Sequence, residues 1–138
     1  MAECVFCAIV AGQLPSTVVA ENAQALAIMD INPAADGHVL VLPKAHSTDL
    51  FDLPPEVGAG MMRLCLQVAQ AIRRALQPEG LNLLHASGRA AGQEVFHTHF
   101  HLVPRRQGDG VLRWWEMRPG DAARIQQVAQ QLRAALEG

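Results

Sequence analysis

Every second residue from 97 to 101 is a histidine: His97, His99 and His101. Side chains alternate between the two faces of a β-strand, so a strand over residues 95–103 places all three imidazoles on one face. An imidazole has a pKa of about 6.5 and is therefore mostly neutral and nucleophilic at pH 7. The alternative is that the three histidines are hydrogen-bonded residues of a half-exposed strand with no chemical role. Three histidines in register after a glycine loop make this alternative the weaker interpretation.

The geometry of a strand limits what this row of histidines can do. Alternate residues lie about 6.6 Å apart, so His97 and His101 are about 13 Å apart on a straight strand. A zinc ion needs its nitrogen ligands about 2.0–2.1 Å away. All three histidines therefore cannot hold one ion, and we expect the row to be divided between jobs.

Cys4 and Cys7 form a C-x2-C pair, a spacing that lets two thiolates bind one zinc ion. Such a site needs two more ligands, and the candidates are His46, His97 and Cys65. Cys65 falls beside the apolar stripe of a predicted helix, so we interpret it as a small buried residue. The alternative for the pair is two buried free thiols.

A glycine-rich loop over residues 87–93 comes directly before the histidines. Gly88 and Gly92 permit positive φ and close approach of a ligand, and successive backbone amides in such a loop can hold an anion. Gln93 can donate an amide hydrogen to a phosphate. Asp30 ends an apolar strand, where its carboxylate can accept hydrogen bonds from both hydroxyls of a ribose or can form a turn; both readings stay open. His38 is expected to be a packed, hydrogen-bonded histidine.

The hydrophobic pattern predicts an α+β fold on an antiparallel sheet. Pro54 and Pro55 open one long helix, and Pro78 and Gly80 end it. Its buried stripe is expected from the apolar residues at helical spacing, namely Val57, Met61, Leu64, Val68, Ile72 and Leu76. Asp121 can cap a last helix. A short helix is expected over residues 4–10, and strands over residues 17–21, 25–30, 38–43, 81–85 and 95–103.

Composition narrows the functional classes. The chain has 138 residues, of which 50% are hydrophobic and 17% charged, and its formal net charge is −2. This length suits a single domain, and the absence of a basic field disfavours binding to nucleic acid or to a membrane surface. No apolar run approaches the roughly 20 residues that cross a bilayer. Three cysteines without a leader-like start favour the cytoplasm.

Residues 97–103 resemble the His-x-His-x-His-x-x signature of the histidine triad (HIT) nucleotide hydrolases. The resemblance extends to residues 92–96 and 104–105, to Met29-Asp30-Ile31-Asn32-Pro33, to residues 37–44 and to the cysteine pair. It covers about residues 4–105, whereas the tail resembles nothing recognisable. It implies one HIT-like domain over residues 1–138, with a core at 4–105, a C-terminal extension with a helix at 106–138, and a five-stranded antiparallel sheet.

The resemblance also implies an activity, namely hydrolysis at the α-phosphate of a purine nucleotide derivative. By position, His99 is the nucleophile that forms a nucleotidyl-histidine, and His101 contacts the phosphate or orients His99. Stabilisation of the developing charge falls to Gln93 and to the amides near Gly92. The nucleotide is expected to be held by Asp30 on the ribose and by Ile31, Phe6 and Leu26 on the base. Structural zinc is expected on Cys4, Cys7, His46 and His97.

A homodimer with joined sheets is implied too, and Leu64 and the two tryptophans are expected to supply exposed apolar surface for it. Two positions depart from the family pattern: Ala86 stands where an asparagine is common, and Glu94 where a serine or threonine is common. The leaving group therefore stays open. The rival hypotheses are a nucleotide-binding adaptor with little turnover, a metalloenzyme chelating through His97 and His99, and a pure zinc module, which leaves the glycine loop unexplained.

Overall fold

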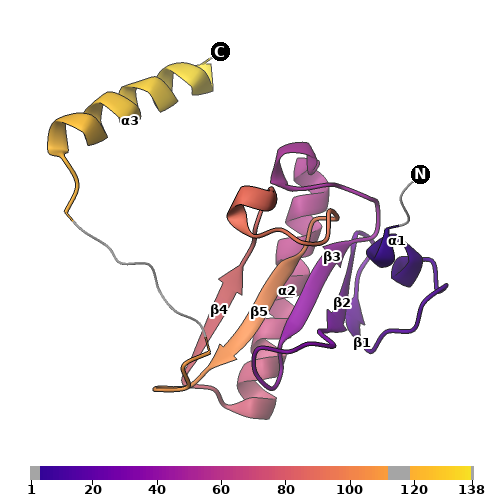
Figure 1. Ribbon diagram of the computed structural model, residues 1–138. Helices are drawn as coiled ribbons and strands as arrows, with labels where there is room; N and C mark the ends of the chain where they lie inside the picture. The colour runs from indigo at the N-terminus through magenta and orange to yellow at the C-terminus, as the bar shows by residue number, and fades with distance from the viewer. Residues whose placement is uncertain (1–3, 112–118, 138) are drawn as a thin grey trace.

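A computed structural model describes residues 4–111 and 119–137. Five antiparallel strands form one sheet in the order β1-β2-β3-β5-β4 (Figure 1). The predicted fold class, an α+β domain on a five-stranded antiparallel sheet, is confirmed. The strands are β1 (Val18–Glu21), β2 (Ala25–Met29), β3 (Val39–Pro43), β4 (Gly80–Leu84) and β5 (Phe100–Arg105), and the helices are α1 (Val5–Val10), η1 (Leu50–Asp52), α2 (Pro55–Leu76), η2 (Arg89–Ala91) and α3 (Ala122–Glu137).

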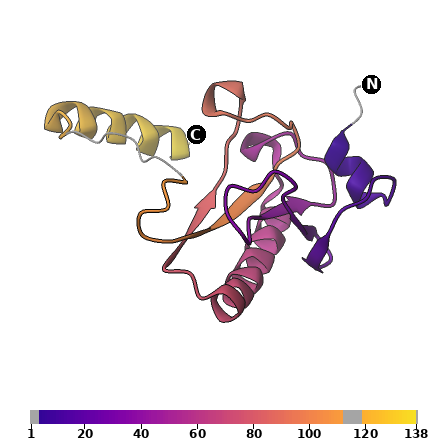
Figure 2. The ribbon, with the colours of Figure 1, turned by 60° about the horizontal axis from the view of Figure 1, so that its bottom comes forward.

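Helix α2 covers one face of the sheet, as the rotated view shows (Figure 2). It begins at Pro55, as the double proline predicts, and ends where Gln77 adopts a left-handed conformation. Its buried stripe lies against alternate residues of β2 and β3, where Ala25 and Ala27 leave room for the helix. The predicted stripe is buried from Met61 to Ile72. The stripe and the strand residues beneath it are Met61, Leu64, Cys65, Val68, Ile72, Ala25, Ala27, Val39, Val41 and Leu102.

Leu64 was expected to leave apolar surface for a partner, and this expectation is wrong. Its side chain is fully buried under α2, at 0% exposure. Leu66 is the most exposed apolar residue of this part of the helix, at 62%, and Met62 is exposed at 38%. Each lies two positions from Leu64, which on an α-helix means the opposite face. The two tryptophans lie outside the described residues.

The other face of the sheet is covered by α1. Phe6 from this helix packs on the alternate residues of β2 and β3, namely Leu26, Ile28, Leu40 and Leu42. Strand β3 is thus buried on both faces along its whole length, which explains its continuous apolar sequence. At the outer edge, β1 is short and its register with β2 shifts between Val18 and Ala20.

The strand that carries the histidines is shorter at its start than predicted. It was expected over residues 95–103 but runs from Phe100 to Arg105. Its pairing with β4 ends at Leu84 opposite His101, and residues 97–99 lie outside the ladder. Thr98 instead donates its backbone N–H to the carbonyl of Ser47, 2.7 Å away, in the loop that follows β3. The chain therefore leaves the sheet where the first two histidines occur.

The predicted C-terminal helix is present as α3, and Asp121 accepts a hydrogen bond from the N–H of Ala123 at its start. None of its described residues is buried, and its apolar residues Ile125, Leu132 and Leu136 are exposed. Within residues 4–111 and 119–137, no helix combines the length and hydrophobicity that a membrane span requires. The division into a core at 4–105 and an extension at 106–138 stays a prediction.

Candidate functional site

The three histidines divide between two neighbouring clusters. His97 lies with Cys4, Cys7 and His46, and their ligand atoms are all within 4.8 Å of one another. His99 and His101 lie beside each other, with ring centroids 4.9 Å apart. The row is thus divided between two sets of partners, as its spacing predicts, although residues 97–99 do not belong to the strand.

The first cluster has the dimensions of a tetrahedral metal site. Nδ1 of His97 lies 3.3 Å from Sγ of Cys4, 3.5 Å from Sγ of Cys7 and 3.2 Å from Nδ1 of His46. Sγ of Cys7 lies 3.3 Å from Nδ1 of His46. The edge of a tetrahedron is about 1.6 times the centre-to-corner distance, so these edges correspond to ligand bonds of about 2.0–2.1 Å. This is the length of zinc–nitrogen bonds and slightly less than the roughly 2.3 Å of zinc–thiolate bonds.

Local structure aims these four ligands. Cys4 is the N-cap of α1, and its Sγ accepts the N–H of Cys7 at 3.4 Å. Nε2 of the buried His97 donates to the carbonyl of Pro43 at 2.8 Å, which leaves its Nδ1 lone pair facing the cluster. Burial lowers the pKa of His97 and so favours the neutral ring that binds metal. Burial and the adjacent Cys4 raise the pKa of the Cys7 thiol, so a thiolate there calls for a compensating cation.

A buried clamp that the sequence analysis did not foresee joins two of these ligands. Ser47 follows His46, Thr98 follows His97, and their hydroxyl oxygens lie 2.8 Å apart. Thr98 Oγ1 also donates to the carbonyl of Ser47 at 3.1 Å. Asp52 accepts hydrogen bonds from Ser47 and from the N–H groups at the start of η1, which lower its pKa to about 2. The polar run over residues 47–52, typical of a capping box, was the available sequence signal.

His99 presents an unprotonated nitrogen when its ring is neutral. Its Nδ1 lies 2.7 Å from the carbonyl oxygen of His97, which can only accept, so Nδ1 carries the proton. Nε2 then holds the free lone pair. Burial lowers the pKa of His99 and favours this neutral form, and Phe6 packs edge-on against its ring. His97 is grouped with Cys4, Cys7 and His46, and His99 belongs to neither cluster of candidate metal ligands among the described residues, so this pair does not form the chelate that the metalloenzyme hypothesis needs.

His101 has the opposite tautomer, which follows from a chain of hydrogen bonds. The N–H of Ala34 donates to Nδ1 of the buried His38 at 3.0 Å, so neutral His38 carries its proton on Nε2. That Nε2 lies 2.9 Å from Nδ1 of His101, which accepts the proton and leaves His101 with an N–H at Nε2. Burial, His99 and His38 lower the pKa of His101 to about 4, so it is neutral at pH 7.

A carboxylate completes this second cluster. Asp30 Oδ2 lies 3.4 Å from Nε2 of His38, and its Oδ1 accepts the N–H of Asn32 in a turn. The ligand atoms of Asp30, His38 and His101 are close enough together for a metal ion. The Ala34 N–H, however, occupies the Nδ1 lone pair of His38, and a proton fills Nε2. This geometry favours a hydrogen-bonded network over a metal site.

The glycine loop has the predicted backbone, since φ is 90° at Gly88 and 96° at Gly92. Its hydrogen-bond donors, which were expected to bind phosphate, are instead used within the protein. Gln93 is buried, and its Nε2 donates to the carbonyls of Thr48 and Val95 at 2.7 and 3.1 Å. Its Oε1 accepts the N–H of Gly88 at 2.7 Å. Both amide hydrogens are used to brace the loop, so they are not free for a phosphate in this arrangement.

The backbone amides near Gly92 are also engaged. The N–H of Gly92 donates to Arg89 and that of Gln93 to Gly88, both in tight turns. Of the residues expected to contact a base, Phe6 and Leu26 are buried, whereas Ile31 is 88% exposed.

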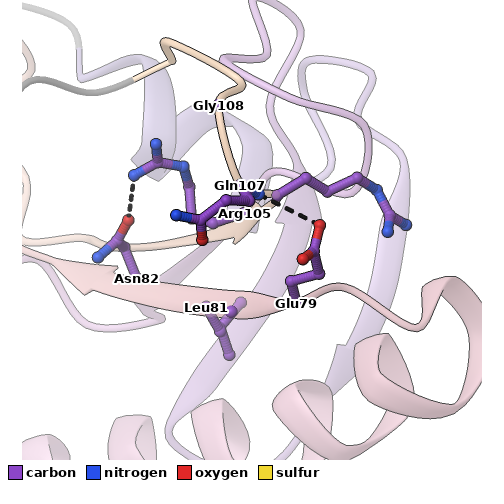
Figure 3. A pocket seen from close by; sticks show the side chains of 8 residues that line it. Glu79, Leu81, Asn82, Arg105, Gln107 and Gly108 are labelled. Carbon is purple, nitrogen blue, oxygen red and sulfur yellow. Dashed lines mark hydrogen bonds between the residues drawn. The ribbon is translucent and has the colours of Figure 1, made fainter.

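A hollow of about 390 Å³ lies at the other end of β4 and β5 (Figure 3). Arg105 at its wall donates to Oδ1 of Asn82 at 2.8 Å and pairs with Asp109. Arg105 lies opposite Gly80 at the start of β4, whereas His101 lies opposite Leu84 at its end. The hollow is therefore separate from both histidine clusters, and Arg105 in its wall is already paired.

Comparison with known proteins gives a consistent result. A family model described as "HIT domain" matches residues 11–108. The chain is 35% identical over 138 residues to an adenosine 5'-monophosphoramidase of Saccharomyces cerevisiae, covering 99% of this chain and 85% of that protein. It is 41% identical over 107 residues to an adenylylsulfatase of Arabidopsis thaliana, covering 78% and 54%.

Two solved structures are also similar. One is a HIT family protein from Bacillus anthracis, with a TM-score of 0.90, 34% identity and 96% of each chain covered. The other is a zinc-bound histidine triad family protein from Mycobacterium smegmatis, with a TM-score of 0.75, 42% identity and again 96% of each chain covered.

Proposed function

The chain belongs to the HIT domain family, and we propose that it hydrolyses purine nucleotide derivatives at the α-phosphate through a nucleotidyl-histidine intermediate. One observation carries the proposal: the carbonyl of His97 fixes the proton of His99 on Nδ1, so Nε2 is a free nucleophile. Burial keeps that ring neutral. The names of two relatives, a monophosphoramidase and an adenylylsulfatase, support an adenylyl substrate.

In the first step Nε2 of His99 bonds to the α-phosphorus, and the bond from phosphorus to the leaving group breaks. The leaving group departs with a proton from solvent. In the second step water attacks the same phosphorus, the phosphorus–nitrogen bond breaks, and the nucleoside monophosphate and free His99 are released. The covalent route divides one difficult displacement into two easier ones.

His101 is proposed to stabilise the charge that develops on the phosphoryl oxygens. Its neutral ring holds a proton on Nε2, because Nδ1 accepts from His38. A neutral imidazole is a very weak acid, so this N–H acts as a hydrogen-bond donor to an oxygen and not as a proton donor to the leaving group. Preorganised donors of this kind supply large electrostatic stabilisation in transition states.

The nucleotide contacts remain proposals. Asp30 is proposed to bind the ribose, with Ile31, Phe6 and Leu26 nearest the base. Gly92 and Gln93 are still proposed to lie beside the phosphate. The side chain of Gln93 is proposed to shape the loop, because its hydrogen bonds are made within the protein. Ala86 and Glu94 leave the choice between an amine, a sulfate and a nucleotide leaving group open.

We further propose one structural zinc ion per chain on Cys4, Cys7, His46 and His97. The edges of the cluster fit zinc, and the Pro43 carbonyl holds the His97 tautomer that a metal ligand needs. A zinc ion bound by four protein ligands is closed to substrate, so it would fix the fold between α1 and the triad and take no part in the reaction. A zinc-bound relative supports this assignment.

A homodimer is proposed through the open edge at β4. This edge strand exposes Leu81 and Leu83 at 38% and 46%, and Leu66 on α2 is also exposed. A second copy that pairs on β4 would join the two sheets and cover this apolar surface. Location in the cytoplasm, and the expectation that neither nucleic acid nor membrane is a partner, stay predictions.

The decisive experiment compares turnover of adenosine phosphoramidate, diadenosine polyphosphate and a sulfate-capped adenosine nucleotide. Rapid quenching in alkaline detergent with a radiolabelled nucleotide should trap the adduct on His99, because a phosphorus–nitrogen bond to imidazole is hydrolysed in acid and survives in base. Turnover of one substrate with that adduct supports the proposal. Tight binding of nucleotide without turnover or adduct would instead support the adaptor hypothesis.

A further inference from the structure

The carbonyl of His99 has a side chain as its hydrogen-bond partner. The β4–β5 ladder ends at Leu84 opposite His101, so the backbone at residue 99 lies beyond it. His85, the next residue after β4, places Nδ1 3.0 Å from the His99 carbonyl oxygen. A carbonyl only accepts, so the His85 ring donates from Nδ1.

The other nitrogen of His85 is held as well. Oγ of Ser87 lies 2.6 Å from Nε2 of His85, and a neutral ring with its proton on Nδ1 can only accept there. Ser87 therefore donates its hydroxyl hydrogen. Its oxygen in turn accepts the N–H of Leu50 at 2.9 Å, at the start of η1. Each proton in this series has one place, so the direction of every bond is fixed.

Packing fixes the plane of the His85 ring. It contacts Phe100 edge-on, with centroids 5.4 Å apart and an interplanar angle of 86°. Phe100 is the first residue of β5 and follows His99 directly. His85 is thus held by its two hydrogen bonds and by the sheet, and it links the regular strand to the irregular segment that carries His99.

We propose that His85 and Ser87 are a positioning pair that holds the backbone of His99 in the orientation needed for attack on phosphorus. This inference rests on the proposed function, in which His99 is the nucleophile. Residues 97–99 lack strand pairing, so the direction of the His99 ring depends on a few side-chain bonds. A misplacement of about 1 Å can cost about a hundredfold in rate, so such a bond has a large effect on the reaction.

Two substitutions of His85 separate the hydrogen bond from the packing. H85F keeps a ring against Phe100 but has no donor, whereas H85N keeps an N–H at the reach of Nδ1. We expect H85F to lower kcat on the best of the three nucleotide substrates by about tenfold to a hundredfold. KM should stay within about threefold, because His85 bonds to the backbone and not to the nucleotide, and H85N should recover most of kcat. Thermal melting reports whether each variant folds.

The outcomes are distinct. An active parent with an H85F kcat within about twofold of it overturns the positioning role, and so does an H85N variant as slow as H85F. A parent with no turnover contradicts the proposed function, and an NMR measurement then still tests the pair. Two-bond ¹H–¹⁵N correlations should show the proton of His85 on Nδ1, and S87A should shift the Nε2 resonance, which loses its hydrogen-bond donor, without moving that proton, because the His99 carbonyl only accepts. A proton on Nε2 in the parent overturns the pair whether or not the protein turns over substrate.

Discussion

The substitution T98V tests the buried clamp between two proposed zinc ligands. Valine keeps the shape of Thr98, which is fully buried, and removes one hydroxyl with its bonds to Ser47 at 2.8 and 3.1 Å. In T98V the Ser47 carbonyl still accepts a hydrogen bond from the backbone N–H of residue 98, and the Ser47 hydroxyl still donates to Asp52. No polar group is left without a partner, so the free energy of unfolding should fall by about 1 kcal/mol.

Thermal and urea denaturation measure this loss, which corresponds to a melting temperature lower by about 3–5 °C in a domain of this size. Competition with a chromophoric chelator should show zinc affinity weakened by about tenfold, as for other groups that orient metal ligands. T98S is the matched control: it loses a buried methyl group but keeps the hydroxyl, so it should lose stability and retain zinc affinity. A T98V protein as stable as the parent, with unchanged zinc affinity, would refute the clamp.

Four further predictions follow from the site. H99A should lower kcat by at least about 10²–10⁴-fold and abolish the trapped adduct while nucleotide still binds by calorimetry; an adduct on another histidine would contradict this assignment. Metal analysis should find one zinc ion per parent chain and none in C7S, and C7S should melt at a lower temperature. A parent protein without metal would contradict the zinc proposal. The pKa of His101 is about 4 when folded and 6.5 when unfolded, so the unfolded chain binds more protons between these values and stability should fall as pH drops from 6.5. His101 should contribute at most about 2 kcal/mol of the loss by pH 5, so the loss should be smaller in H101Q, and equal slopes would argue against a neutral His101. L83K should shift sedimentation at micromolar concentration towards the 14.9 kDa monomer, and a parent that is already monomeric would exclude the dimer.

The sheet and the long helix could be predicted because the spacing of apolar residues along the chain shows which side chains are buried in a strand or a helix. The apolar run of β3 and the spacing of Met61, Leu64, Val68 and Ile72 are local patterns, and the structure buries them as predicted. The start of β5 was placed too early because Val95 and Phe96 have strand-like side chains. The Ser47 carbonyl competes for the backbone of Thr98, and no local pattern reveals a partner 51 residues away.

The candidate site was predicted to a similar degree. Residue type and spacing indicated Cys4 and Cys7 as a metal-binding pair and left His46, His97 and Cys65 as candidates for the other ligands. The resemblance to the HIT family supplied the full set, and the structure brings Cys4, Cys7, His46 and His97 together. The direction of a side-chain amide is not encoded in that way: Gln93 faces inward because the Thr48 carbonyl needs a donor. The tautomers of the histidines likewise depend on backbone atoms of distant residues, such as Pro43, and only the folded chain defines them.

The two edges of the sheet differ, and this difference limits how many copies can assemble. The register shift in β1 twists and shortens one edge, which makes it a poor template for a further strand. The regular edge at β4 is the one that can accept a neighbour. When two copies meet there around a twofold axis, each uses its single open edge on the other, so growth stops and no filament can form.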